Sequence, residues 1–318
     1  MRTIILCLFF LFQLSCFAKN DSTGFFSPSG QFNSKRFTGV VASEGLLCSA
    51  TLIGLNSLWY KDYPRSNFHF FNDNDEWLQM DKVGHAVTAH YIGKVGIDAM
   101  KWSGVKAKKA IWYGGSLGLV YLTAVEVLDG FSSEWGASVG DLAASILGIA
   151  IVISEELVWD EQRILLKYSF HRSDIAQYRP QLLGNSYTNS MLKDYNGQTY
   201  WISFNIASFL KGQTDAVRQL ADVSVSRRFP KWLNIAFGYG AHGMTGGSEN
   251  PTEVDGEPIQ SFDRYRQYYL SLDIDLTRIK TRSGLLKACF KTLSFIKIPF
   301  PALEYNTKDG FVFCDFYF

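Results

Sequence analysis

The chain has little of what usually identifies an enzyme or a nucleic-acid-binding protein. Its net charge over 318 residues is only +1, which gives no electrostatic reason to expect nucleic acid as a partner. Its five cysteines form no CxxC pair and no HExxH sequence is present, so two common metal and redox motifs are absent. We therefore expect neither a metal nor a cofactor, and whether the chain is an enzyme stays open.

The hydrophobic runs of the sequence are short as well. The first, Ile4 to Phe12, follows a positively charged start and is too short to span a bilayer, which is typical of a signal peptide. We expect residues 1–18 to direct export, with cleavage after Ala18. The alternative is a weak lipobox ending at Cys16, which would leave a lipid on that cysteine.

Apolar and aromatic residues are abundant. Apolar residues make up 47% of the chain and aromatic residues 15%, enough for a sizeable core and typical of sheets and membrane interfaces. Residues 19–43 are rich in Ser, Gly, Asn and Lys and are expected to form an irregular lead-in.

The apolar spacing predicts a helical domain over residues 44–168. Its helices are expected at about residues 44–60, 81–101, 106–128 and 138–166. The apolar cores of the last two helices, Ile111–Val125 and Leu142–Ile153, fall short of the ~20 residues that a membrane span needs. They are therefore either buried bundle helices or marginal membrane helices, and both interpretations stay open.

An acidic, aromatic loop precedes the second of these helices. Its acids lie between Asp73 and Glu76. They lack the spaced oxygen ligands and the turn glycine of a calcium-binding EF-hand. We interpret them as a solvated N-terminal cap for the helix that follows.

Residues 169–318 are predicted to form a β-rich domain. Apolar and polar residues alternate from Tyr200 to Ala207, from Leu233 to Tyr239 and from Tyr268 to Thr277, which indicates strands with one apolar and one polar face. The terminal segment from Phe311 resembles the last strand of an outer-membrane barrel. The fold class is therefore α+β, a helical bundle followed by an antiparallel β-rich half, with closure into a small or partial barrel left open.

Ionisable side chains at the ends of the apolar helices mark the candidate polar site. Groups three or four residues apart share a helix face, and charged groups beside apolar helices are expensive to bury, which favours a functional role. If the helices pack together, three sets of side chains can converge. The candidate site residues are Asp81, Lys82 and His85 on the second helix, Glu126 and Asp129 on the third, and Ser138, Asp141 and Ser145 on the fourth.

These motifs resemble those of the YfiM-like family of predicted periplasmic lipoproteins, whose function is unknown. The pattern DK-x-x-H, E-x-x-DG and WG-x-S-x-x-D appears here as Asp81-Lys82-His85, Glu126-Asp129-Gly130 and Trp135-Gly136-Ser138-Asp141. The layout is also similar, more remotely, to VanZ-like membrane proteins. Members of both groups often carry an Asn where this chain has Ser145. The resemblance covers roughly residues 45–165 and implies an envelope location and a helical polar site, but no activity.

We therefore expect an exported protein of the periplasm or outer membrane, associated with membrane or lipid. The leading hypothesis is a cell-envelope protein of unknown activity whose helical pocket binds a lipid or lipid-linked head group. One alternative is an envelope hydrolase or transferase that uses His85 with nearby carboxylates on a lipid-linked substrate. Another is a structural outer-membrane element. Helix caps and salt bridges that only fix the packing of the helices, without any ligand, would explain the same residues.

Overall fold

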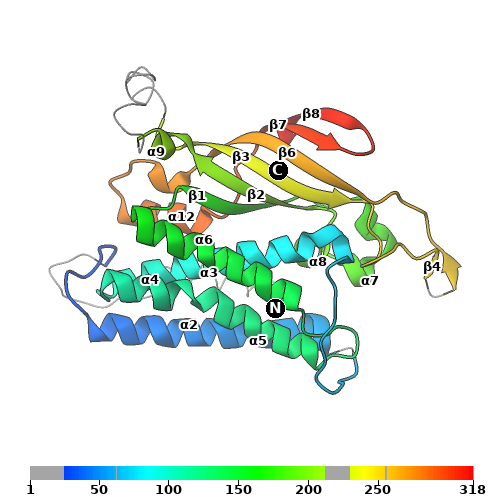
Figure 1. Ribbon diagram of the computed structural model, residues 1–318, viewed down its shortest axis with the longest axis horizontal. Helices are drawn as coiled ribbons and strands as arrows, with labels where there is room; N and C mark the ends of the chain where they lie inside the picture. Colours follow the sequence, from blue (N-terminus) through cyan, green and yellow to red (C-terminus); the bar gives the residue numbers. More distant parts are fainter. Residues whose placement is uncertain (1–24, 62, 212–229, 255, 318) are drawn as a thin grey trace. The chain divides into compact units, whose positions relative to one another are not determined.

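The computed structural model describes residues 25–61, 63–211, 230–254 and 256–317. The chain divides into two compact units, one containing residues up to Asp75 together with Asp81–Asp160, the other containing Glu76–Met80 together with Glu161–Phe318. The expected signal peptide and Cys16 lie outside the described residues. Helices make up the first unit and an antiparallel six-stranded sheet dominates the second, which confirms the α+β class (Figure 1).

Among its described residues, the helical unit has one α-helix before the acidic loop and four after it. Helix α2 spans Ser34–Leu55 and runs on into a π-helical turn, Asn56–Tyr60. Its N-terminus is fixed by the side chain of Asn33, which accepts a hydrogen bond from the Arg36 N–H. The expectation of irregular chain through residue 43 is therefore wrong for the segment from Ser34 onward, because a good N-cap starts the helix early.

The later helices differ from the expected ones at their ends. Helix α3 spans Met80–Trp102, while the expected third helix is divided at Ser116 into α4 (Ala107–Gly115) and α5 (Leu117–Gly130). Helix α6 spans Val139–Trp159 and ends at Asp160, which has a left-handed backbone with φ of 51°. The expectation that this helix continues to residue 166 is wrong, since a strand begins at Ile164.

The helices of this unit approach one another closely at glycines. A Cβ atom on Gly118 of α5 would lie 2.2 Å from the carbonyl oxygen of Ala89 on α3, and one on Gly148 of α6 would lie 2.1 Å from the carbonyl oxygen of Ala86. Only a residue without a side chain allows this backbone contact. An apolar core of Ile97, Ile111, Val152 and Ile153 fills the space beyond it.

Much apolar surface on these helices is nevertheless exposed. Three helical segments are long and apolar enough to cross a membrane, judged by length and composition: Ser34–Leu55, Ala107–Gly130 and Val139–Trp159. Only 6% of the apolar window in the first is buried. The length of these segments therefore does not exclude a membrane span, and the two interpretations from the sequence both stand.

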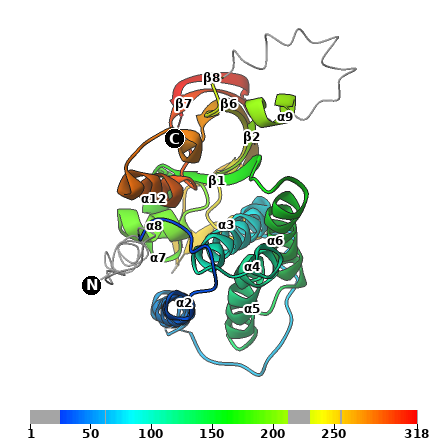
Figure 2. The same cartoon turned by 90° about the vertical axis from the view of Figure 1, so that its left-hand side faces the viewer.

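The second unit is built on one antiparallel sheet in the order β1-β2-β3-β6-β7-β8. Its strands are joined by short helices, by a long segment that carries the small hairpin β4–β5, and by helix α12. Figure 2 shows that the sheet curves strongly. In the part of the chain that the structure describes, the outer strands β1 and β8 are not paired with each other, so the sheet is not closed into a barrel. Two strands of this sheet, β1 and β7, were not predicted, and the small hairpin β4–β5 was not predicted either. The strands are β1 (Ile164–Phe170), β2 (Gln198–Asn205), β3 (Leu233–His242), β4 (Glu253–Val254), β5 (Glu257–Pro258), β6 (Tyr265–Ile274), β7 (Phe300–Asn306) and β8 (Gly310–Tyr317).

The second unit also has described helices. The 3₁₀ helices are η2 (Glu76–Gln79), η3 (Ile175–Tyr178) and η4 (Leu276–Arg278). The α-helices are α7 (Pro180–Leu183), α8 (Tyr187–Lys193), α9 (Ile206–Lys211) and α12 (Gly284–Leu293).

The sheet turns its polar side inward. Lys167 and Asp273 form an ion pair of 2.6 Å in which both side chains are fully buried. Beside them, the hydroxyl of Ser203 donates to Asp273 at 2.6 Å. The aromatic rings of Trp201 and Tyr269 pack on the same inner face. The alternation predicted from the sequence is present, but its polar residues form the interior.

Candidate functional site

The three predicted sets of polar residues come from three helices of the first unit. Asp81, Lys82 and His85 lie in the first turns of α3. Glu126 and Asp129 lie near the end of α5, while Ser138 caps α6 and Asp141 lies in its first turn. The glycine contacts of α3 with α5 and α6 bring these helices close enough for their side chains to meet.

Lys82 is the centre of the cluster. Its Nζ lies 2.7 Å from Asp73 Oδ1, 2.9 Å from Asp141 Oδ1 and 3.7 Å from Asp81 Oδ2. The Lys82 side chain is only 12% exposed. One ammonium group is therefore shared by three carboxyl groups in a largely buried setting.

Asp73 was not among the predicted site residues. Its loop was interpreted as a solvated cap, but its side chain is 16% exposed and pairs with Lys82. The Ser138 hydroxyl also donates to it at 2.5 Å. Asp73 lies nine positions before Lys82, outside any helical spacing, so no local pattern could have connected the two.

Ser138 connects the two halves of the cluster. Its backbone N–H donates to Glu126 Oε2 at 2.7 Å, and its hydroxyl accepts a hydrogen bond from the Asp141 N–H at 3.1 Å. Glu126 Oε1 in turn lies 3.8 Å from His85 Nε2, and Asp81 Oδ1 lies 4.0 Å from the same nitrogen. His85 is thus placed between two carboxyl groups.

Two of the predicted residues do not contact this cluster directly. Asp129 instead accepts a hydrogen bond of 2.7 Å from the Tyr60 hydroxyl. Ser145 is buried on α6, and its hydroxyl has no hydrogen-bond partner among the described residues. His90 on α3 is also buried, and burial lowers its pKa to about 3.

Burial raises the pKa of several acids in and beside the cluster. Desolvation raises the pKa of Glu126 to about 7, against a hydrogen bond from Ser138 that lowers it. Desolvation likewise raises the pKa of Asp129 to about 7. The pKa of Asp141 is raised by burial and by Asp81, whereas hydrogen bonds from Lys82 and Ser138 hold the pKa of Asp73 below its usual range in spite of burial.

The cluster and its surroundings contain more acidic than basic side chains. Five carboxyl groups, those of Asp73, Asp81, Glu126, Asp129 and Asp141, share the neighbourhood of one lysine and one histidine. Such an excess of carboxyl groups attracts a cationic group, and a cation that bound there would lower the raised pKa values again.

A metal ion fits this cluster less well than its composition suggests. Asp81, His85 and Asp141 offer ligand atoms that all lie within 4.8 Å of one another. The Lys82 ammonium, however, already lies within 4 Å of both carboxylates of this set. A metal ion would have to displace the Lys82 ammonium, which is already paired with these carboxylates.

Two short glycine motifs can be found in the sequence, and the structure assigns neither to catalysis. The residues 114–118 have the G-x-S-x-G spacing of a nucleophile elbow, but Ser116 separates two helices, not a strand and a helix, and its hydroxyl donates to Trp112 O. The residues 238–243 have G-x-G-x-x-G spacing but lie in and just after strand β3. Both motifs require a strand followed by a helix.

Comparison with known proteins supports the envelope location. A family model described as "Predicted periplasmic lipoprotein (DUF2279)" matches residues 69–155, which include the acidic loop and every candidate site residue. The match covers well under half of the chain, and all six strands of the large sheet lie outside it. No curated protein and no solved structure matches the chain. The match indicates an exported, envelope-associated protein of unknown activity.

Proposed function

We propose that this is a membrane-associated protein of the cell envelope whose helical unit binds the polar head group of a lipid or lipid-linked molecule. The observation that carries the proposal is the buried, acid-rich cluster around Lys82, His85 and Glu126 on helices with exposed apolar faces. The resemblance to YfiM-like and VanZ-like proteins, both groups of the envelope or membrane, is consistent with it.

The charge of the cluster favours a head group that carries an amine. An ammonium group beside Glu126 would add a positive charge to a cluster in which carboxyl groups outnumber the one lysine and the one histidine. Apolar side chains on the same helices, such as Val127 and Ile146, are 45% and 47% exposed. They would contact the acyl part of the same molecule.

The experiment compares a lipid whose head group carries an amine with one whose head group carries none. The purified full-length protein in mild detergent is mixed with phosphatidylethanolamine or phosphatidylglycerol, and binding is measured by native mass spectrometry and thermal shift. We expect phosphatidylethanolamine to bind more tightly. Its binding should strengthen as pH rises through about 7, since Glu126 and Asp129 lose their protons there.

Matched variants connect binding to the cluster. Glu126→Gln and Asp81→Asn should weaken phosphatidylethanolamine binding by about tenfold each, the loss expected for one charged contact. Glu134→Gln, in the exposed loop between α5 and α6, should leave it unchanged. If neither lipid binds, or if Glu126→Gln and Glu134→Gln behave alike, the proposal is wrong.

A second candidate function, hydrolysis or group transfer on a lipid-linked substrate, is favoured by the position of His85. Its Nε2 lies 3.8 Å from Glu126 and 4.0 Å from Asp81, close enough to tighten into the contact of a general base with its orienting carboxylate. His85→Gln separates the two functions. Under this candidate the variant would still bind the lipid-linked substrate but lose turnover, whereas a head-group site without chemistry shows no turnover in either protein.

A further inference from the structure

The outer face of the sheet, on the second unit, carries two continuous apolar rows. Residues directly opposite one another on neighbouring strands form each row. One row is aliphatic and phenylalanine-rich and crosses all six strands: Leu166, Ile202, Phe237, Leu270, Leu303 and Phe313. The other is aromatic throughout: Tyr168, Tyr200, Tyr239, Tyr268, Tyr305 and Phe311.

The aliphatic row is exposed over most of its length, whereas the aromatic row is exposed only on β6, β7 and β8, since its members on β1, β2 and β3 are half-buried. In the aliphatic row, Ile202, Phe237, Leu270, Leu303 and Phe313 are between 41% and 67% exposed. In the aromatic row, Tyr268, Tyr305 and Phe311 are between 43% and 73% exposed. Continuous apolar patches on a protein surface usually mark an interaction site.

The inner face of the same sheet has the opposite character. The ion pair of Lys167 with Asp273 is fully buried there, and Ser203, Asn205 and Asn234 join it in one hydrogen-bonded network. A water-soluble sheet normally packs its apolar face inward. Apolar outward and polar inward is the alternation of sheets that face lipid.

The order of side chains along β6 matches the depth profile of a membrane. Arg266, Tyr268, Leu270, Leu272 and Ile274 alternate with the inward residues and so share the outer face. A cation is followed by a tyrosine and then by three aliphatic residues. Tyrosine prefers the level of the lipid head groups, and aliphatic side chains prefer the acyl chains. The ten residues of β3 and of β6 also reach the 9–11 residues of a strand that faces a bilayer.

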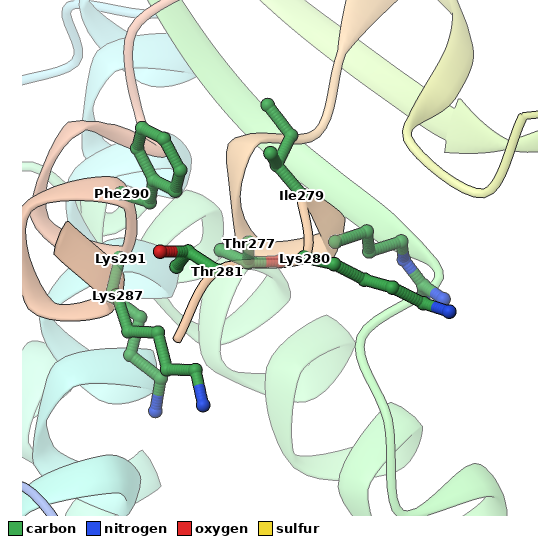
Figure 3. A pocket seen from close by; sticks show the side chains of 8 residues that line it. Thr277, Ile279, Lys280, Thr281, Lys287, Phe290 and Lys291 are labelled. Carbon is green, nitrogen blue, oxygen red and sulfur yellow. The ribbon is translucent and has the colours of Figure 1, made fainter. Parts of the chain in front are cut away.

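The far end of β6 carries the opposite boundary, a basic groove. A cavity of about 460 Å³ lies between η4 and α12, and Lys280, Lys287 and Lys291 line it (Figure 3). The neighbouring Leu285 and Leu286 of α12 are 48% and 41% exposed. Cations beside exposed leucines complement anionic lipid phosphates at a membrane surface.

We propose that the outer face of this sheet lies against envelope lipids, with the aliphatic row among the acyl chains and the tyrosine row at the head groups. The occupant is a lipid membrane, because the aromatic row, the aliphatic row and the basic groove follow one another in the order that the levels of a bilayer complement. This surface is on the second unit, and the proposal does not depend on the head-group site of the helical unit.

The test uses a local readout, since the helical unit can attach the protein to membranes by itself. The photo-crosslinking amino acid p-benzoylphenylalanine replaces Leu270, Leu303 or Phe313 in the full-length protein. Each protein is irradiated in vesicles of phosphatidylethanolamine and phosphatidylglycerol, and adducts are identified by intact mass. The control is the same replacement at Leu192, which is on α8 of the same unit and is also 41% exposed.

We expect lipid adducts at all three positions in about tenfold excess over position 192, since only the outer face contacts acyl chains. Thermal unfolding checks that each labelled protein remains folded. Lipid adducts no more frequent than at position 192 would overturn the proposal. Adducts with a second copy of the chain would also overturn it, because they would assign the face to a protein interface.

Discussion

At the scale of single residues, Lys82 connects the most groups in the candidate site. Its ammonium pairs with Asp73 and Asp141 while only 12% of its side chain is exposed. Removing one partner of a buried ion pair leaves the other charge unpaired, and this costs far more than the pair itself contributes. The stability of the helical unit should therefore depend on this lysine.

Lys82→Met should destabilise the protein by about 3–5 kcal/mol at neutral pH. The loss should shrink as pH falls, because protonated Asp73 and Asp141 carry no unpaired charge. Denaturant unfolding at several pH values measures both effects. Lys101→Met on the same helix is the matched control, with an expected loss of about 1 kcal/mol, since one of its partners, Asp160, is 84% exposed. An equal loss of unfolding free energy in the two variants would contradict the prediction that the helical unit depends on Lys82 in particular.

Glu126 should make stability dependent on pH. Its pKa is about 7 in the folded protein, above the ordinary value of 4.5, so the folded state holds a proton that the unfolded state releases. The stabilising contribution is complete below about 4.5 and is lost as pH rises through about 7. We expect the free energy of unfolding to fall over this window by roughly 1–3 kcal/mol.

Glu126→Gln should flatten that pH dependence. The amide oxygen can still accept the hydrogen bond from the Ser138 N–H, which holds the local structure, but it cannot ionise. Chemical unfolding between pH 4.5 and 8 compares the variant with the parent. A pH dependence that is unchanged in the variant would show that Glu126 is not its source.

At the scale of helices, glycines decide how closely α3, α5 and α6 approach. A Cβ on Gly118 or Gly148 would lie 2.2 or 2.1 Å from backbone oxygen atoms of α3, and backbone cannot move aside as a flexible side chain can. Close approach is also what brings Lys82 and Asp141 within 2.9 Å. The packing of the helices and the geometry of the candidate site therefore depend on the same positions.

Gly118→Ala should cost about 1–3 kcal/mol, the usual penalty for overpacking. Gly45→Ala on α2 is the matched control, since a Cβ there meets nothing within 4 Å. It should stabilise the helix by about 0.5–1 kcal/mol. Thermal unfolding distinguishes the two, and a neutral Gly118→Ala would mean that the helices are free to separate.

At the scale of the whole molecule, the two units resemble each other in one respect: each has exposed apolar surface outside and charges inside. In the helical unit the charges surround Lys82, and in the sheet unit they surround Lys167. Each unit also has buried apolar residues, such as Val152 in the helical unit and Trp201 in the sheet unit. The exposed apolar surface agrees with the envelope location that the family match indicates.

Lys167→Met tests the polar interior of the sheet. It would leave Asp273 fully buried without its 2.6 Å partner, so we expect a loss of about 3–5 kcal/mol. Lys287→Met, at an exposed position of α12, should change stability by less than about 0.5 kcal/mol. Denaturant titration of both variants, monitored by tryptophan fluorescence, gives the comparison. A small loss for Lys167→Met would indicate that water reaches the inner face.

The sequence by itself determined the properties that depend on nearby residues. The alternation from Tyr268 to Thr277 indicated a two-faced strand, and the charges of Asp81, Lys82 and His85 marked the start of an apolar helix, because both patterns repeat within one element. Only the tertiary structure decided which face of the sheet is buried, since that depends on partners such as Lys167 and Asp273, which lie 106 positions apart in the sequence. It also decided that Asp73 joins Lys82. Asp73 lies in a loop and Lys82 on a helix, so the two residues share no face of one element, and only the folded backbone brings them together.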